Sequence, residues 1–388
     1  MTTEFARFLS GEGIEVRVAT AFPYYPEWRL YPGYGAALWR TERLGEVRVL
    51  RAWHFVRVAP GAFARIAHEI SLCLLSIPTI IRALRGVGTA YIVSPDLSLA
   101  WLGSLIAGIM GKRRILFVQD VMPDAAIELG MLRNAFLISF SRRLARTLYA
   151  SADEIYTLGE GMRRRIAAAT AAPEKIRLVP NTIDPDELAP PDPGANRFRE
   201  RFVAPGKFAV VHSGNMGEKQ NLPLLLRTAD LLRSMLDIHF FVIGDGAVKD
   251  EFLRKKSEMR LENVTHLGFL EREMLPDMLA GADVFLVSQV PEAIDIVVPS
   301  KLVTAMGAGA MVIAACDPSS ETGRMVSTSG GGIVTSPTDE SALARNILSV
   351  RDGEVDAARC RVNARSFAVA HFSRREVYGP LAQRLLDN

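Results

Sequence analysis

The segment Ser213-Gly214-Asn215-Met216-Gly217-Glu218-Lys219 indicates the fold class, because it joins a strand pattern to a helix pattern. The apolar run Phe208–His212 precedes it, and a helical pattern begins at Leu222. A glycine-rich turn of this kind is typical of open α/β sheets, which bind ligands at the carboxyl ends of their strands. The next helix offers free N–H groups and a positive dipole end to an anion, although an ordinary turn with a solvated lysine is the alternative. The predicted ligand contacts are Gly214, Asn215, Gly217 and Lys219.

A second segment of this kind, Pro299-Ser300-Lys301, opens the helix pattern that leads to Met306-Gly307-Ala308-Gly309. It follows the apolar run Val284–Val287, and we expect Pro299 to fix the helix entry and Ser300 to cap it. Lys301 would lie in the first helical turn, where a cation is electrostatically disfavoured unless an anion binds nearby. The alternative is a lysine that points to solvent. Two such sites in one domain predict a diphosphate ligand, and hence an enzyme that uses a nucleotide sugar.

A third loop, Gly244-Asp245-Gly246, ends the strand pattern Phe240–Ile243. It is not a dinucleotide fingerprint, because Lys249 occupies the expected third glycine position. This absence of a complete fingerprint argues against a nicotinamide dehydrogenase. We expect the loop to wall the base or ribose of a nucleotide.

Two carboxylates, Asp120 and Asp124, flank Pro123 immediately after the strand pattern Ile115–Val118. Carboxylates at a strand end can orient a sugar hydroxyl or take its proton. Aspartate and proline are equally common in plain turns, so both interpretations stay open.

The chain length of 388 residues predicts two domains, since a single core rarely grows so large. Strand and helix patterns alternate throughout, which predicts parallel sheets with crossover helices in an α/β fold. The proline-rich stretch 180–194 resembles a linker. We predict an N-terminal domain at 1–188, a second domain at 189–370, and a final helix at 371–388 that packs back on the first.

Composition excludes several classes of protein. The net charge of +3 is too small to indicate a nucleic-acid partner. Three scattered cysteines fit a reducing cytoplasm, and neither they nor the six histidines show metal-ligand spacing. The apolar stretches Ile70–Ile81, interrupted by Pro78, and Leu97–Met110 fall short of the roughly 20 residues that span a bilayer. They are predicted to be core helices or, with the nearby arginines, helices that rest on a membrane face.

Together these motifs resemble the family 4 retaining glycosyltransferases, whose GT-B fold has two Rossmann-like domains with parallel sheets that face each other across a cleft. The resemblance extends over nearly the whole chain. The Pro-Ser-Lys signature is similar to that of the branch containing the colanic-acid fucosyltransferases and related exopolysaccharide enzymes. The segments that carry it are Phe22–Pro26, Val118–Asp124, Val179–Asp184, the turn at 213–217 and Ala282–Leu286.

This resemblance implies transfer of a hexose, with retention, from a UDP- or GDP-linked sugar to a hydroxyl of a polysaccharide or lipid-linked acceptor. Lys219 and Lys301 would lie against the diphosphate, and Asp120 would position or deprotonate the acceptor. Asp124 and Asn181 would help to bind that acceptor. No cofactor or metal is expected, and the enzyme would be cytoplasmic, with peripheral contact at the inner membrane face.

Two departures from the family pattern bear on this prediction. Many members carry two glutamates, eight positions apart, where this chain has Ile296 and Thr304; Asp295 is the nearest acid and is expected to substitute for the first. The family also begins with a strand and a glycine-bearing loop, whereas here Thr3–Ser10 already has a helical pattern, so the first strand is predicted to be missing. Two alternatives remain open: a nucleotide-sugar 2-epimerase of the same architecture, and a catalytically impaired nucleotide-sugar-binding protein.

Overall fold

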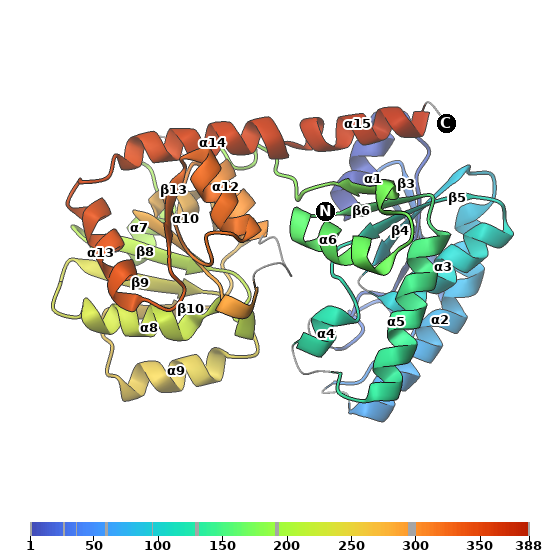
Figure 1. Ribbon diagram of the computed structural model, residues 1–388, viewed down its shortest axis with the longest axis horizontal. Helices are drawn as coiled ribbons and strands as arrows, with labels where there is room; N and C mark the ends of the chain where they lie inside the picture. Colours follow the sequence, from blue (N-terminus) through green and yellow to red (C-terminus); the bar gives the residue numbers. More distant parts are fainter. Residues whose placement is uncertain are drawn as a thin grey trace. The chain divides into compact units, whose positions relative to one another are not determined.

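The computed structural model describes residues 2–25, 28–35, 37–58, 61–94, 96–128, 132–190, 194–293 and 300–386. The chain forms two compact units (Figure 1). Unit 1 comprises Met1–Pro180 with Tyr378–Asn388, and unit 2 comprises Asn181–Val377. Strands and helices alternate in both, which confirms the α/β class and the two Rossmann-like halves.

Unit 2 contains a six-stranded parallel sheet in the order β10-β9-β8-β11-β12-β13. The chain starts in the middle at β8, moves outward to β10, and then returns to the other side of β8 at β11. The strand order therefore reverses between β8 and β11, which is where open α/β sheets bind ligands. The strands are β8 (Phe208–Ser213), β9 (Ile238–Ile243), β10 (Val264–Leu267), β11 (Val284–Ser288), β12 (Val312–Ala315) and β13 (Gly332–Thr335).

Helices cover both faces of this sheet (Figure 1). The contacts group α8 with α9 and α13, and group α14 with α11 and α12. The strands are mostly apolar, as expected for a parallel sheet that is buried on both faces, and His212 and Ser288 are buried polar exceptions. The helices are α7 (Arg197–Phe202), α8 (Leu222–Leu231), α9 (Lys249–Glu258), α10 (Leu275–Gly281), α11 (Ser300–Gly307), α12 (Glu321–Ser329), α13 (Glu340–Arg351) and α14 (Ala357–Phe372).

Unit 1 divides its strands between two sheets, ordered β1-β3-β2 and β4-β5-β6-β7. Pairing is parallel except between β2 and β3, which are antiparallel and joined by a two-residue turn at Gly45-Glu46. The sequence analysis missed β2, because its mostly exposed, polar residues lack an apolar alternation. The strands are β1 (Arg17–Ala21), β2 (Trp39–Leu44), β3 (Val47–Ala52), β4 (Thr89–Ser94), β5 (Arg113–Val118), β6 (Glu154–Thr157) and β7 (Ile176–Leu178).

One helix of unit 1, α2, carries a proline in its interior. Pro78 does not end α2, so the apolar stretch 70–81 is part of one continuous helix. By length and composition, Phe63–Leu84 could cross a membrane. The helices are α1 (Thr2–Gly11), α2 (Ala62–Leu84), α3 (Leu97–Ile109), α4 (Asp124–Glu128), α5 (Ala135–Ser151) and α6 (Glu160–Ala169).

Residues 181–190 pack on the rest of unit 2, so this stretch is not a free linker. Ile183 is buried and forms a parallel bridge with Ser373, and Arg374 pairs with Asp184 at 2.6 Å. The prolines suggested a linker because they exclude helix, but they do not prevent an extended segment from packing. The last helix, α15 (Arg374–Leu386), begins here and continues into unit 1, where the Tyr378 ring lies 4.8 Å from that of Phe5.

Candidate functional site

The loops that follow β8 and β9 lie directly against each other. The amide of Gly214 donates to the Ile243 carbonyl at 2.9 Å, and that of Met216 donates to the Asp245 carbonyl at 2.8 Å. A Cβ on Gly244 would lie 2.0 Å from the Gly214 oxygen, and the φ of Gly244 is +136°. Glycine is therefore required for this contact, because a side chain would push the two loops apart.

The other side of the β8 loop is tied to the end of β11. The Val290 amide donates to the Lys219 carbonyl at 3.1 Å, and the Ser288 hydroxyl donates to the Gln220 carbonyl at 2.5 Å. The loops after the three neighbouring strands β9, β8 and β11 thus form one hydrogen-bonded surface at the switch point of the sheet.

Asn221 directly precedes α8, but its side chain does not cap the helix. The residue has a left-handed backbone, with a φ of 45°, and its amide instead donates to the Pro337 carbonyl at 2.7 Å. The side chain therefore holds the loop to the segment after β13, while the Asn221 carbonyl accepts from the Leu224 amide of α8 at 3.1 Å.

Lys301 reaches from the first turn of α11 to the β8 loop. Its ammonium donates to the Gln220 side-chain oxygen and to His212 Nε2, the latter at 3.4 Å. A Cβ on Gly214 would lie 3.7 Å from Lys301 Cδ, so the lysine stem lies over the glycine turn. Burial lowers the pKa of Lys301 to about 7. The structure thus brings Lys301 next to the predicted glycine turn at 213–219.

His212 orients this ammonium from inside β8. It is fully buried, and its Nδ1 lies 3.1 Å from the Leu286 carbonyl, to which an N–H at that position donates. In this tautomer Nε2 is an acceptor that faces Lys301. Burial and the charge of Lys301 hold the pKa of His212 well below its usual value. The sequence analysis gave neither His212 nor Gln220 a role in the site, because their contact with Lys301 depends on strand order.

Lys219 is half-buried, and its ammonium has no hydrogen-bond or ion-pair partner within the described ranges. Asp245 is engaged locally, because its carboxylate pairs with Lys249 at 2.7 Å and accepts from the Gly246 amide. Asn215 is exposed, with its amide beside Gly217. This part of the site therefore offers a cation and free polar groups to a ligand.

The start of α11 corrects one prediction. Ser300 is the first residue of the helix and not its cap, and its carbonyl accepts a hydrogen bond from the Thr304 hydroxyl at 3.0 Å. Asp295 and Pro299 lie outside the described residues.

In unit 1, Asp120 and Asp124 follow β5, as the sequence indicates. The amide of Gln119 donates to the Ser94 carbonyl at 3.0 Å, which holds this strand end against β4. Asp124 begins α4 and accepts from Arg142 of α5 at 3.4 Å. Asn181, the third predicted acceptor residue, is the first residue of unit 2.

A polar cluster that the sequence did not reveal lies past the ends of β1, β3 and β4. The Tyr24 ring lies 4.7 Å from the buried His54 ring and 5.1 Å from that of His68. Burial, and then the charge of Asp96, raise the pKa of Glu69 to about 7. Burial and the nearby His68 lower the pKa of His54 to about 4. These residues come from separate motifs, so spacing along the chain could not show them together.

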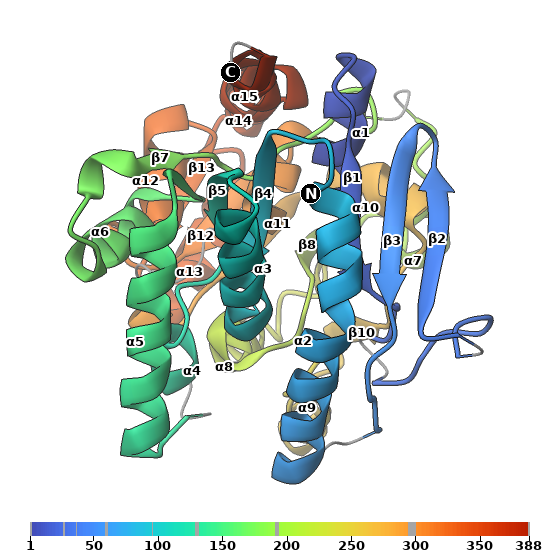
Figure 2. The ribbon, with the colours of Figure 1, turned by 90° about the vertical axis from the view of Figure 1, so that its right-hand side faces the viewer.

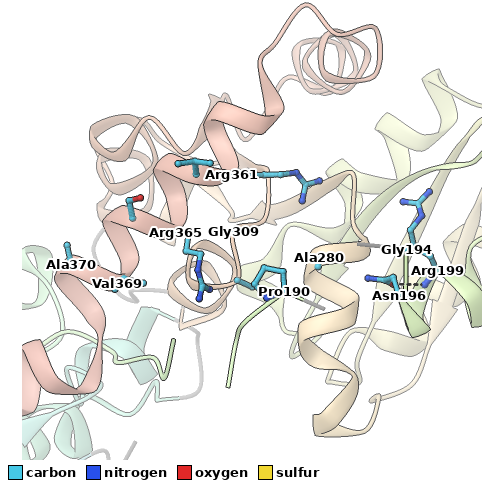
Figure 3. Close-up of a pocket in the computed structure, with 13 residues that line it drawn as sticks. Pro190, Gly194, Asn196, Arg199, Ala280, Gly309, Arg361, Arg365, Val369 and Ala370 are labelled. Atoms are coloured by element: carbon cyan, nitrogen blue, oxygen red, sulfur yellow. Dashed lines mark hydrogen bonds between the residues drawn. The ribbon is translucent and has the colours of Figure 1, made fainter. Parts of the chain in front are cut away.

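Unit 2 also has a pocket of about 740 Å³ that none of the predicted site residues lines (Figure 3). Three arginines point into it, but carbonyl groups already accept from each of them. Arg361 donates to the Ala282 carbonyl at 2.7 Å, Arg365 to that of Pro185 at 3.1 Å, and Arg199 to that of Gly281 at 2.8 Å. We therefore assign these arginines a structural role. Within the described ranges, no three His, Cys, Asp or Glu side chains gather as a metal site.

Comparison with known proteins matches both units. A model described as glycosyl transferase 4-like domain matches residues 1–182, and one described as glycosyl transferases group 1 matches residues 207–352. The chain belongs to the family 4 glycosyltransferases. It is 28% identical over 354 residues to the putative colanic acid biosynthesis glycosyl transferase WcaI of Escherichia coli K12, covering 89% of this chain and 86% of that protein.

Two further matches concern ligands. The GT-B fold is shared with HepE of Anabaena, solved with UDP and glucose, at a TM-score of 0.69 and 17% identity, covering 88% of this chain and 86% of HepE. A Campylobacter jejuni N-acetylgalactosaminyltransferase named for a diphospho-undecaprenol acceptor is 24% identical over 168 residues, 43% of each protein. The chain is a glycosyltransferase of polysaccharide biosynthesis, as predicted from its motifs.

Proposed function

We propose that this enzyme transfers a hexose, with retention, from a UDP- or GDP-linked sugar to a hydroxyl of an exopolysaccharide precursor or its lipid-linked form. The observation that carries this proposal is the position of the Lys301 ammonium. Its ammonium is held over the glycine turn by Gln220 and His212, at the switch point of the unit 2 sheet. No carboxylate pairs with this ammonium among the described residues, so it is available to a bound anion.

The proposed chemistry follows from this charge arrangement. As the bond between the sugar and the diphosphate breaks, the leaving group gains negative charge. We propose that Lys219 and Lys301, with the positive dipole ends of α8 and α11, stabilise that charge. We expect each lysine to contribute a factor of about 10²–10³ in rate, which is typical for one preorganised donor. These groups take the part that a metal ion plays in other transferases, so we propose that transfer needs neither metal nor cofactor.

The acceptor is proposed to bind at the strand ends of unit 1. Asp120 would hold the acceptor hydroxyl or take its proton, and Asp124 and Asn181 would bind its neighbouring hydroxyls. We further propose donor contacts from Gly244 and Gly246 and from the segment that contains Asp295. The enzyme would work in the cytoplasm, peripherally on the membrane that carries its acceptor.

Thermal-shift screening against UDP- and GDP-sugars, followed by transfer assays with and without EDTA, tests this proposal. We expect stabilisation by one donor class, transfer that survives EDTA, and a product with the donor's anomeric configuration by NMR. Lys219→Ala should lower turnover about 10²–10³-fold while the protein stays folded. Unchanged transfer by this variant would remove the lysine from the mechanism.

Two other functions give different results in the same assays. The cluster that contains His54, His68 and Glu69 supplies the acid and base groups that a 2-epimerase requires, so the donor is also incubated without acceptor. An epimerised nucleotide sugar would favour that activity. Calorimetric binding of the donor without transfer to any of a panel of acceptors would favour a binding protein.

A further inference from the structure

Helix α2 presents a row of large apolar side chains to solvent. Phe63 is 84% exposed, and Ile66 and Ile70 follow it on the same helical face. The opposite face, which includes Ala64 and Leu72, is buried, and α2 packs on β1, β3 and α3. The helix is therefore held against unit 1 along its length, and only its outer face is available to an apolar partner.

Helix α5 presents a second group of the same kind. Phe136 is 76% exposed, and Leu137 and Phe140 are exposed beside it in the first two turns. Both α2 and α5 pack on α3, and Figure 2 shows the beginnings of α2 and α5 on either side of α3, at the same end of unit 1. We call Phe63, Ile66, Ile70, Phe136, Leu137 and Phe140 the docking surface.

The charges on the helices that carry the docking surface are mostly positive. Helix α5 carries three arginines and no acid, and α3 carries no charge. Helix α2 carries Arg65 and Arg82 against a single acid, Glu69. Arg65, Arg143 and Arg146 are exposed, without a carboxylate partner within the described ranges. Apolar side chains rimmed by arginines complement an anionic bilayer. The apolar side chains can enter its acyl region, and its head groups attract the arginines.

We propose that the docking surface binds an anionic phospholipid bilayer, with α2 lying on the membrane and not crossing it. The docking surface adjoins the proposed acceptor site, because Arg142 of α5 contacts Asp124 at 3.4 Å. The role of docking in presenting a lipid-linked acceptor rests on the proposed function. Docking would bring the acceptor's sugar to the carboxyl ends of the unit 1 strands while its lipid stays in the bilayer.

Vesicle flotation of the full chain tests the inference. Vesicles of phosphatidylcholine with phosphatidylglycerol are compared with vesicles of phosphatidylcholine alone. We expect binding to the anionic vesicles only, weakened by salt. The double variant Phe63→Ser/Phe136→Ser should bind at least about tenfold more weakly, because two large apolar groups no longer enter the bilayer. Replacing Arg143 and Arg146 by glutamine should weaken binding about fivefold for each arginine.

Matched controls separate docking from other effects. Phe269→Ser removes a phenylalanine that is 70% exposed in unit 2, and should leave binding unchanged. The inference is overturned if the wild type binds neither vesicle, if Phe269→Ser weakens binding as much as the double variant, or if the bound protein resists alkaline carbonate. A dimer in sedimentation that the double variant dissociates, without vesicle binding, would likewise overturn it in favour of a second copy.

A transfer assay in detergent with a soluble acceptor keeps the two proposals distinct. The double variant should transfer sugar at the wild-type rate there, because the surface residues do not touch donor or acceptor. Loss of transfer in every variant, including the wild type, would refute the proposed function and leave the vesicle result standing. A double variant that binds vesicles as the wild type does would refute docking alone.

Discussion

Protonation of Lys301 is predicted to couple nucleotide binding to pH. Burial lowers the pKa of this ammonium to about 7, whereas a diphosphate beside it would raise that pKa again. A group with a pKa of about 7 is about half protonated at pH 7 and about one-tenth protonated at pH 8. Binding of UDP should therefore take up about 0.5 proton at pH 7 and about 0.9 proton at pH 8. The affinity should fall about tenfold for each pH unit above 7, until the pKa of the complex is reached.

Isothermal titration calorimetry in buffers of different ionisation enthalpy measures this uptake between pH 7 and 9. The terminal phosphate of UDP, with a second pKa of about 6, stays ionised over this range. Of the described groups that face the ammonium, Gln220 does not titrate, and the pKa of His212 is held well below its usual value. The change of UDP affinity with pH should therefore report on the protonation of Lys301.

Three variants decide the outcome. Lys301→Met should bind UDP weakly, with no proton uptake and no slope. Lys301→Arg, which stays charged, should bind without a slope. Lys219→Met should lose affinity but keep the slope of the wild type. The reasoning would be refuted if Lys301→Met still took up a proton on binding, because the titrating group would then lie elsewhere.

The same pKa has a consequence for the protein without ligand. The pKa of Lys301 is lower in the folded state than the ordinary value of 10.5, so folding favours the neutral amine. The favourable contribution to stability is present above pH 10.5 and is lost as the pH falls through about 7. The wild type should thus lose stability relative to Lys301→Met as the pH falls from 10 to 6. Urea titrations of both proteins at fixed pH measure this difference in the free energy of unfolding.

Three other substitutions have defined outcomes. Gly244→Ala should cost about 1–3 kcal/mol in thermal unfolding and weaken UDP binding, because its Cβ would meet the Gly214 carbonyl, whereas Gly268→Ala, with nothing within 4 Å, should be nearly neutral. Asp277→Ala should cost about 1–3 kcal/mol in urea unfolding, since the Arg197 backbone N–H and side chain both lose the carboxylate that accepts from them; no measurable loss would show that these hydrogen bonds are replaced by water. Asp120→Asn should lower kcat about 10²-fold or more without changing the UDP affinity, and a changed affinity alone would place this residue on the donor side.

The element pattern was predictable because it depends on neighbouring residues. The strand patterns 208–212, 284–287 and 115–118 fall within β8, β11 and β5, and α8 begins at Leu222 as predicted, since apolar periodicity and flanking turn residues lie within each segment. Prediction failed where that local signal was weak or misleading. The exposed strand β2 has no apolar alternation, and the prolines of 180–194 suggested a linker where Ile183 packs on unit 2.

The sequence alone therefore shows an α/β glycosyltransferase with lysines beside two strand-end turns. It could not show that Lys301 meets His212, which is 89 residues away in the chain, or Gln220, which is 81 away. Those contacts exist because β11 returns to the side of β8, so that the helix after β11 begins over the turn after β8. The lowered pKa of Lys301 arises there too, because burial comes from residues that only the folded sheet assembles around it.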